Sequence, residues 1–339
     1  MSRGDRTARK TRVLFIRPSK ASFIEQDLKL LEKHYDVRTL DVFEKGRSLG
    51  NKVSVFWRMF RGVLWADVTY SWFAEVYALW AVRLSRLLGK QSVVVIGGYE
   101  VAQVPEISYG SALHPETREM VAKILSKAGK SIAVSEFVKR SARTIAPDAD
   151  IDVVYNAVDV DALVPSEPKM EIVVTVGGAT RPRWVLKGID IFVSASTKVP
   201  GAKFVVIGPF DQQVVDGLQK MNQAVEFTGE LSRERLIEWL DKAKVYCQLS
   251  RVESFGFALA EAMSLECYPV VSDQGALPEV VGESGLIVPY GDPIAAAEAI
   301  KKGLRWVNGH DARTRIAERF SVDRREKDLC RVIDSLVSR

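Results

Sequence analysis

The sequence predicts an α/β protein made of two doubly wound domains in tandem, each a parallel sheet covered by helices on both faces. Three observations lead to this prediction. The chain has 339 residues, which is long for one hydrophobic core and suits two. Short apolar runs alternate with amphipathic helical patterns in both halves. A segment rich in Asp, Pro and Ser, residues 159–169, separates the two halves like a linker.

The first half alternates strands and helices. Its expected strands are 12–16, 36–42, 66–71, 91–96, 131–134 and 151–155. Its expected helices are 23–35, 73–88, 115–128 and 136–145. The run 91–96 is continuously apolar, as in parallel sheets buried on both faces. We therefore expect a first domain over residues 1–160.

The alternation starts again after the linker. The expected strands are 171–176, 202–207, 226–229, 245–249, 268–272 and 285–288. The expected helices are 187–198, 232–242, a helix opening near residue 256, 293–306 and 312–337. These elements predict a second domain over 161–310, and helices in 311–339 that could pack back on the first domain. Two doubly wound domains in tandem place a ligand cleft between the facing carboxyl ends of their strands.

Composition excludes several classes of protein. Hydrophobic residues make up 47% of the chain and charged residues 27%, as in soluble globular proteins. The net charge of +5 fits an anionic ligand or an acidic membrane surface, and no nucleic-acid motif accompanies it. The three cysteines lie far apart without metal spacing, which predicts buried thiols in a reducing compartment. The basic opening lacks the apolar run of a secretory signal, and no apolar run approaches the roughly 20 residues that span a bilayer.

Residues 250–261 read SRVESFGFALAE and follow the expected strand 245–249. The helix that opens near Gly256, with Ser254 as its N-cap, would direct bare N–H groups at an anion. A carboxylate at Glu253 is unusual beside an anion and suits the binding of hydroxyl groups. The alternative is that Glu253 caps the helix and that Glu261 is an ordinary solvated helix residue.

A second glycine-containing turn follows the expected strand 171–176. Gly177 and Gly178 let backbone N–H groups approach an anion closely, and Arg181, Arg183 and Lys187 follow with positive charge. The alternative is a tight turn with solvated basic side chains.

Together with SDQGALPEVV at 272–281 and GLIVPYGD at 285–292, these motifs resemble the C-terminal domain of retaining glycosyltransferases of family GT4, glycosyltransferase group 1. The resemblance is strong over roughly residues 130–300. It includes the segment 156–159, where Ala157 replaces the glycine of the family's NGVD. The resemblance implies the GT-B fold, with two tandem Rossmann-like doubly wound domains and an interdomain cleft.

The resemblance also implies roles for single residues. Glu253 would contact the hydroxyls of the donor sugar, and Glu261 would accept hydrogen bonds from the ribose of the nucleotide. Lys187, with Arg181 in preference to Arg183, would neutralise the leaving diphosphate. The donor site would also include Gly177, Gly178 and the backbone N–H groups of Ser254, Phe255 and Gly256. The family usually has Arg after the first glycine of the turn, where this chain has Gly178.

The acceptor side departs from the family pattern. Many relatives have a His where this chain has Gly97, followed here by Gly98, Tyr99 and Glu100. Glu100 is a candidate for the acceptor pocket, and the alternative is a surface carboxylate. Ser19, in the first loop, and His114 are further candidates, whereas His34 and His310 are expected to be structural or solvated.

Two other patterns suggest sites. Asp148, Asp150 and Asp152 alternate like a metal-binding motif but fall in a polar turn, so solvated carboxylates are favoured. Residues 51–65 form an apolar, aromatic and basic helical pattern with Phe56, Met59, Phe60 and Val63 on one side and Arg58 and Arg61 near its rim. This helix either packs that face on the sheet or lies on a membrane surface.

The sequence therefore predicts a metal-independent retaining glycosyltransferase without a cofactor, since the nucleotide-sugar is itself a substrate. The acceptor would be a glycan, a lipid-linked molecule or a small molecule. We expect a cytoplasmic protein, or a peripheral one on the inner face of the cell membrane, with no nucleic-acid partner; the oligomeric state is left open. The alternative is a catalytically silent GT-B protein that binds a nucleotide-sugar. A GT-B sugar phosphorylase is disfavoured because such enzymes usually have longer chains.

Overall fold

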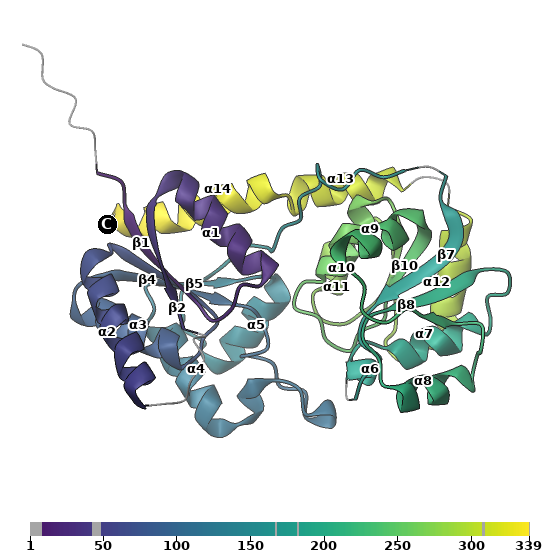
Figure 1. The fold of residues 1–339 in the computed structure, drawn as a ribbon, viewed down its shortest axis with the longest axis horizontal. Helices are drawn as coiled ribbons and strands as arrows, with labels where there is room; N and C mark the ends of the chain where they lie inside the picture. Colours follow the sequence, from purple (N-terminus) through teal and green to yellow (C-terminus); the bar gives the residue numbers. More distant parts are fainter. Residues whose placement is uncertain (1–8, 43–48, 167, 182, 307–308, 339) are drawn as a thin grey trace, which may run out of the picture. The chain divides into compact units, whose positions relative to one another are not determined.

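The computed structural model describes residues 9–42, 49–166, 168–181, 183–306 and 309–338, and the chain divides into two compact units. Unit 1 comprises Met1–Val134, Val138–Val154 and Arg325–Arg339, and unit 2 comprises Ser135–Phe137 and Tyr155–Arg324. Each unit contains a six-stranded sheet with helices packed on it (Figure 1). The expected α/β architecture of two doubly wound domains is confirmed. The division differs in detail from the expected boundaries, since residues 155–160 and 311–324 group with unit 2.

The sheet of unit 1 is entirely parallel, with the order β2-β1-β3-β4-β5-β6. The strands are β1 (Arg12–Arg17), β2 (Asp36–Asp41), β3 (Val68–Trp72), β4 (Gln91–Ile96), β5 (Lys130–Ala133) and β6 (Ile151–Val153). The helices are α1 (Ser22–His34), α2 (Leu49–Trp65), α3 (Val76–Leu87), α4 (Pro115–Lys127), α5 (Glu136–Ile145) and most of α14 (Val322–Val337), with short 3-10 turns at Pro105–Ile107 and Ser111–Leu113.

Side-chain alternation along the strands assigns the two faces of this sheet. Leu14 and Ile16 of β1 pack with Met59 and Val63 of α2, in a cluster that also includes residues of α3. Tyr70, from the neighbouring strand β3, points to the opposite face, where it contacts α1 and α14. Both faces are therefore buried, as the continuous apolar runs of the strands indicate.

A buried ion pair ties α14 to α1 within unit 1. Arg325 is 1% exposed and Asp27 0%, and their side chains meet at 2.5 Å between Nε and Oδ1. Tyr70 and Trp72 of β3 also donate to the Asp27 carboxylate, at 2.7 and 3.0 Å. Arg325 donates further to the Val154 carbonyl at 3.1 Å. Every charge in this cluster is met by several protein groups, which is the condition for burying an ion pair.

The sheet of unit 2 has the order β12-β11-β10-β7-β8-β9, again parallel. The strands are β7 (Met170–Val176), β8 (Lys203–Ile207), β9 (Glu226–Phe227), β10 (Ala243–Gln248), β11 (Tyr268–Ser272) and β12 (Leu286–Val288). In chain order this is the 3-2-1-4-5-6 arrangement of Rossmann folds. The order reverses between β7 and β10, and ligands of such sheets bind where these two strands end.

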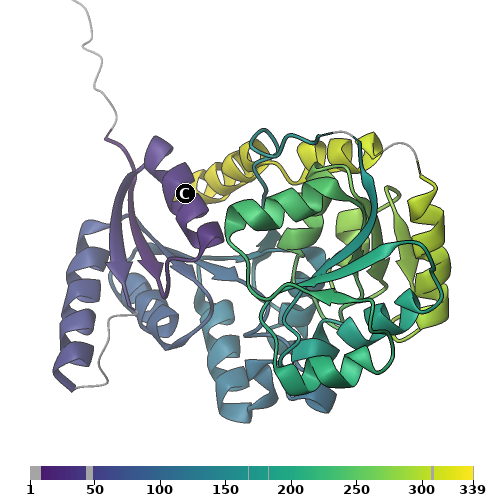
Figure 2. The same cartoon turned by 45° about the vertical axis from the view of Figure 1, so that its right-hand side comes forward.

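Helices cover both faces of this second sheet (Figure 2). One face packs against α9 (Arg233–Lys242), α10 (Phe257–Ser264), α11 (Leu277–Val281) and α13 (His310–Arg319). The other face packs against α7 (Ile189–Ser196), α8 (Gln212–Gln219) and α12 (Pro293–Leu304). The helix α6 (Arg183–Leu186) is a single turn that precedes α7.

Four helical expectations require correction. The helix expected over 187–198 is interrupted at Gly188, which adopts a left-handed φ of 64°. The helix α8 was not expected, and α11 forms where a loop was predicted. The long helix expected over 312–337 is two helices, because the backbone leaves the helical conformation at Phe320. Single-sequence periodicity does not detect such breaks, since they depend on what the turn packs against.

Cys247 and Cys267 are buried free thiols, and Cys330 is half-buried. Among the described residues, no helix is both long enough and apolar enough to cross a membrane.

Candidate functional site

The central strands of unit 2 end side by side and bring two loops together. β7 ends at Val176 and is followed by Gly177, while β10 ends at Gln248 and is followed by the loop that contains Glu253. These are the two strands between which the sheet order reverses. Backbone N–H groups and side chains at such a point are available to a ligand.

Lys187 reaches this point because two glycines let the backbone approach closely. A Cβ on Gly177 would lie 3.1 Å from the Cβ and Cγ of Lys187, so the lysine stem lies across the end of β7. A Cβ on Gly188 would lie 1.9 Å from the Leu249 carbonyl oxygen, and its left-handed φ also favours glycine. The turn that carries Lys187 is therefore pressed against the end of β10.

Glu253 lies beside this lysine. Its Oε2 accepts from Lys187 Nζ at 2.7 Å and from Gln248 Nε2 at 2.7 Å. The lysine side chain is 28% exposed and the glutamate 17%, so both remain accessible. Gly275 contacts the backbone of Glu253, since a Cβ there would lie 2.4 Å from the Glu253 carbonyl oxygen. The structure thus brings together two residues that the sequence placed in separate motifs.

Gln248 was not selected from the sequence, although a lone amide in an apolar strand was a signal for it. It is 3% exposed and also lies near Tyr246, whose hydroxyl donates to Oε1 of Gln248 at 3.2 Å. The chain of contacts from Tyr246 through Gln248 fixes the orientation of the Glu253 carboxylate.

The helix α10 begins two residues later than an N-cap at Ser254 would place it. Its N-cap is Gly256, with a φ of 96°, so the expectation that Ser254 caps the helix is wrong. The reason is the loop geometry: the chain enters the helix through a left-handed residue, which a serine adopts poorly. Phe255 is 2% exposed and its ring packs against Phe257 and Phe320, so only its backbone is a candidate for binding.

Glu261 lies inside α10 and is 8% exposed, which excludes the ordinary solvated position. Its Oε1 meets Arg233 Nη1 at 2.6 Å. Burial raises the pKa of Glu261, and the guanidinium of Arg233 opposes that rise. Arg233 had no sequence signal, because its closeness to Glu261 arises from the packing of α9 on α10.

The other residues predicted for the donor side, Arg181, Arg183 and Gly178, form no side-chain hydrogen bond or ion pair with Lys187 or Glu253 within the described part of the chain. Arg181 and Arg183 are exposed, and the backbone N–H of Arg181 donates to Asp211 at 3.0 Å. Gly178 lies against Pro209, whose carbonyl oxygen would be 3.4 Å from an added Cβ. The structure brings Lys187, Glu253 and Gly177 into one group and leaves both arginines at its solvent side.

In unit 1, the loop after β4 explains why Gly97 replaces a histidine. A Cβ on Gly97 would lie 2.3 Å from the Phe73 ring, and Phe73 itself has a left-handed φ of 65°. Left-handed backbone is a rare conformation for a bulky residue, and such residues cluster at functional sites. The phenylalanine ring thus occupies the space next to residue 97.

Glu100 is neither a surface carboxylate nor freely available. It is 4% exposed and accepts from the backbone N–H groups of Gly97 at 2.9 Å and Gly98 at 2.8 Å. Burial raises its pKa, while these backbone donors oppose the rise. The carboxylate therefore holds the shape of the loop after β4.

Tyr99 and Ser19 are exposed, and the Tyr99 ring contacts that of Tyr109 with centroids 5.2 Å apart. His114 is the N-cap residue of α4, and its neighbours Leu113 and Pro115 line a hollow of about 380 Å³ in unit 1. Asp150 and Asp152 lie 2.6 and 3.6 Å from Lys130 Nζ, as expected for surface carboxylates.

Comparisons with known proteins agree with the resemblance found in the sequence. Residues 171–305 match the family model described as glycosyl transferases group 1. The chain is 29% identical over 165 residues to a D-inositol 3-phosphate glycosyltransferase of Mycobacteroides abscessus, covering 42% of this chain and 37% of the relative. It is 30% identical over 192 residues to a phosphatidyl-myo-inositol mannosyltransferase of Mycobacterium leprae, covering 51% and 49%. The chain spans less than half the length of these relatives.

Among solved structures, HepE of Anabaena in complex with UDP superposes with a TM-score of 0.76 at 16% identity, covering 96% of this chain and 100% of that protein. The structural likeness establishes the GT-B fold of the chain. The resemblance to group 1 glycosyltransferases is likewise confirmed.

Proposed function

Starting from a GT-B chain whose second unit resembles the group 1 glycosyltransferases, we propose that this protein transfers a sugar from a nucleotide-sugar to an acceptor with retention of configuration. The observation that carries the proposal is the contact of Lys187 and Gln248 with Glu253 at the reversal point of the unit 2 sheet. The two groups match the two ends of a sugar diphosphate: the cation suits the anionic diphosphate, and the carboxylate suits the hydroxyl groups of the sugar.

The proposed mechanism relies on charge stabilisation. The diphosphate leaves as an anion, and Lys187 together with the N–H groups at the start of α10 stabilises the charge that develops on it. Arg181 and Arg183, exposed beside the first turn, supply further positive charge, so these groups take the part that a metal plays elsewhere. Retention follows from attack on the face that the diphosphate leaves, with a diphosphate oxygen taking the proton of the acceptor hydroxyl. Glu253 and Glu261 hold hydroxyls of the sugar and the ribose.

The test is turnover, followed as release of free nucleoside diphosphate from a panel of UDP- and GDP-sugars. Lys187→Ala should lower the rate by about 10²- to 10³-fold, the usual effect of removing one group that stabilises transition-state charge. Lys203→Ala is the matched control, because Lys203 forms a 2.7 Å pair with Glu226 on the same sheet. Equal rates for wild type and the Lys187 variant would contradict the site assignment.

The same assay separates the catalytically silent alternative. A silent protein would bind a nucleotide, seen as a thermal shift, but release no product from any donor. Ligand at a hundred times its dissociation constant adds about 2.7 kcal/mol of stability, which such a screen readily detects. No contact among the described residues favours this alternative.

We further propose a lipid-linked acceptor reached from a membrane surface. The relative from Mycobacterium leprae is named for a phosphatidyl-myo-inositol substrate. In unit 1, Phe56 and Trp57 of α2 and Trp80 of α3 are exposed and form a continuous aromatic row, with ring centroids 5.8 Å apart between Phe56 and Trp80. We call Phe56, Trp57 and Trp80 the aromatic patch.

Charge favours an anionic bilayer as the partner of this patch. The sequences of α2 and α3 contain no Asp or Glu, and they contain Lys52, Arg58, Arg61, Arg83 and Arg86. Met59 and Val63 of the expected apolar face are buried on the sheet, whereas Phe56 remains outside. One side of α2 therefore packs on the sheet, and the neighbouring side carries exposed aromatic rings. These two sides correspond to the two alternatives given for this segment, packing on the sheet and binding a membrane surface. Aromatic rings with nearby cations are the composition of interfacial helices.

Co-sedimentation with vesicles tests the membrane proposal. Wild type should pellet with phosphatidylglycerol vesicles and little with phosphatidylcholine vesicles, and Trp57→Ser with Trp80→Ser should abolish pelleting. Ile294→Ser is the control, since Ile294 is an exposed apolar residue of unit 2. Equal pelleting of the double variant and wild type would contradict the proposal.

A further inference from the structure

Arg233 occupies the first position of α9, directly after its N-cap Ser232. Its side chain is 52% exposed, whereas that of Glu261 is 10% exposed. The 2.6 Å contact between Arg233 Nη1 and Glu261 Oε1 therefore joins the solvent-exposed N-terminus of α9 to a buried carboxylate in α10. Arg233 belongs to no motif of the sequence, and the family resemblance implies no role for it.

The surroundings of Glu261 make its charge dependent on this one guanidinium. Burial raises the pKa of Glu261, and the Coulombic attraction and hydrogen bond of Arg233 lower it. Tyr246 of β10 is a second titratable group in electrostatic contact with Glu261, and Glu253 also acts on that tyrosine. Arg313 of α13, which packs on α10, donates instead to the carbonyl of Ser264, the last residue of α10.

We propose that Arg233 is a positioning residue that keeps the Glu261 carboxylate ionised and oriented to receive both hydroxyls of a nucleotide ribose. An ionised carboxylate is acceptor-only, with two oxygens for two hydroxyl donors. A protonated carboxyl has a donor on one oxygen, so it no longer offers two acceptors to the two ribose hydroxyls. The inference rests on the proposed function, because it takes the ligand of Glu261 to be a nucleotide.

The proposal has a pH signature. Binding selects the ionised form of Glu261, so affinity falls as pH drops through the pKa of that carboxyl. Without Arg233, burial acts on Glu261 unopposed by a cation and the pKa rises further. The variant should therefore need a higher pH than wild type to reach the same affinity for nucleotide, and its affinity should recover as the pH increases.

The experiment is calorimetric titration of the full chain with UDP and with GDP, from about pH 5.5 to about pH 9. Arg233→Ala should weaken binding of the preferred nucleotide by about tenfold for each pH unit below the new pKa, and the loss should disappear at high pH. Arg233→Lys should restore most of the affinity. Glu261→Gln should bind weakly at every pH, with or without Arg233.

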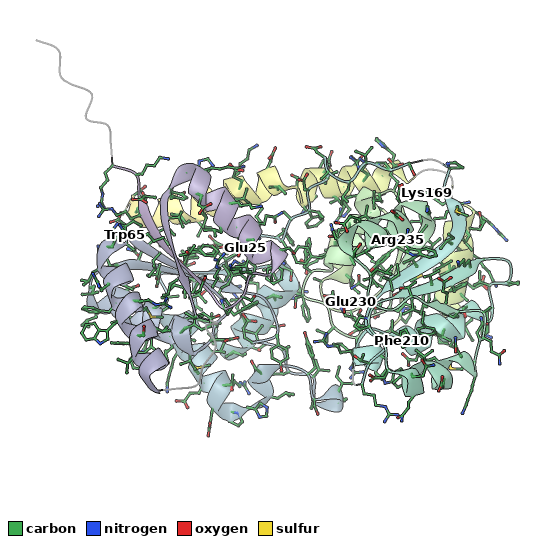
Figure 3. The ribbon with its side chains drawn as sticks, viewed as in Figure 1. Glu25, Trp65, Lys169, Phe210, Glu230 and Arg235 are labelled. Carbon is green, nitrogen blue, oxygen red and sulfur yellow. The ribbon has the colours of Figure 1, made fainter. Side chains whose placement is uncertain are left out.

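Arg235 provides the matched control on the same helix (Figure 3). Its side chain pairs with Glu238 at 2.9 Å and is 66% exposed, so Arg235→Ala should leave the affinity and its pH profile unchanged. The thermal stability of Arg233→Ala, measured in parallel, should fall below that of Arg235→Ala as the pH rises, because only the first variant leaves a buried carboxylate without its cation, whereas Glu238 is exposed.

Three results would overturn the inference. Unchanged affinity in Arg233→Ala would remove any role for the residue. An equal loss at every pH would indicate a direct contact with the nucleotide, and tighter binding would indicate that Arg233 competes with the ribose. Failure of wild type to bind either nucleotide contradicts the proposed function itself, whereas normal wild-type binding with a pH-independent variant contradicts only the role of Arg233.

Discussion

Two ion pairs of similar length differ in almost every other respect. Arg325 and Asp27 in unit 1 meet at 2.5 Å with side chains 1% and 0% exposed. Lys187 and Glu253 in unit 2 meet at 2.7 Å with side chains 28% and 17% exposed. The first pair joins two helices to the face of a sheet, and the second lies where two strands end.

Their surroundings explain the difference. The Asp27 carboxylate accepts hydrogen bonds from Arg325, Tyr70 and Trp72, so its hydrogen-bonding capacity is used within the protein. In Glu253, by contrast, a single oxygen, Oε2, accepts the hydrogen bonds of both Lys187 and Gln248. A buried, fully coordinated pair stabilises one arrangement of the chain, whereas an accessible pair can exchange partners with a ligand. Burial, more than distance, separates a structural pair from a candidate site.

The largest effect is expected at the buried pair. Asp27→Ala should destabilise the protein by about 3–5 kcal/mol, because it removes the carboxylate that balances the buried Arg325 charge. Urea denaturation measures the change. Glu226→Ala, which breaks the exposed pair with Lys203, is the control and should cost about 1 kcal/mol or less. Similar losses in the two variants would show that burial does not distinguish them.

A smaller effect is expected at the loop after β4. Gly97→Ala should cost about 1–3 kcal/mol, because the new methyl group would overlap the Phe73 ring. Phe73→Leu should recover part of this loss when combined with Gly97→Ala, since the smaller side chain gives the methyl group room. Purely additive effects of the two changes would argue against a steric cause.

A third variant tests how Glu253 is oriented. Gln248→Leu removes one of the two donors to Glu253 Oε2, and it is made with Tyr246→Phe so that no buried hydroxyl loses its acceptor. Turnover should fall by roughly tenfold, the effect of one hydrogen bond to a charged group. Tyr246→Phe alone is the reference and should retain most of the activity. Equal rates for the reference and the combined variant would remove Gln248 from the site.

The smallest effect is the stability of Lys187→Ala. Both partners are partly solvated, so the free energy of unfolding should change by less than about 1 kcal/mol. A loss as large as that of Asp27→Ala would make the Lys187 pair structural and would erase the contrast between the two units.

Most of the fold was predictable from the sequence, and the site was predictable in part. Within the described residues, the twelve strands lie where strands were expected. The signal is strongest for central strands such as β3 and β4, which are buried on both faces, whereas the edge strands β2 and β9 are polar and partly exposed. Glu253, Glu261 and Lys187 were selected through a motif that survives at low overall identity. The helix start near Gly256 was expected, although Ser254 was the wrong cap residue. The left-handed break at Gly188 escaped prediction, since glycine marks many turns but does not tell which of them interrupts a helix.

The aromatic residues of α2 illustrate a different limit. The helical pattern predicted one apolar side, and Met59 and Val63 are indeed buried there. Phe56 belongs to the same expected side but is 38% exposed, because it meets Trp80 of α3 instead of the sheet. The bulky ring of Trp65, at the end of α2 (Figure 3), is covered by Arg38, whose guanidinium carbon lies 4.1 Å from the ring centroid.

The sequence by itself determined the α/β class, the two-domain organisation and the identity of the charged residues near the strand ends. These properties follow from periodicity and from short motifs, which are local along the chain. Only the tertiary structure decided which charges meet: Lys187 with Glu253, Arg233 with Glu261, and Arg325 with Asp27. Such pairs join segments far apart in sequence, and their burial, which sets their availability to a ligand, arises from the packing of helices on the sheets.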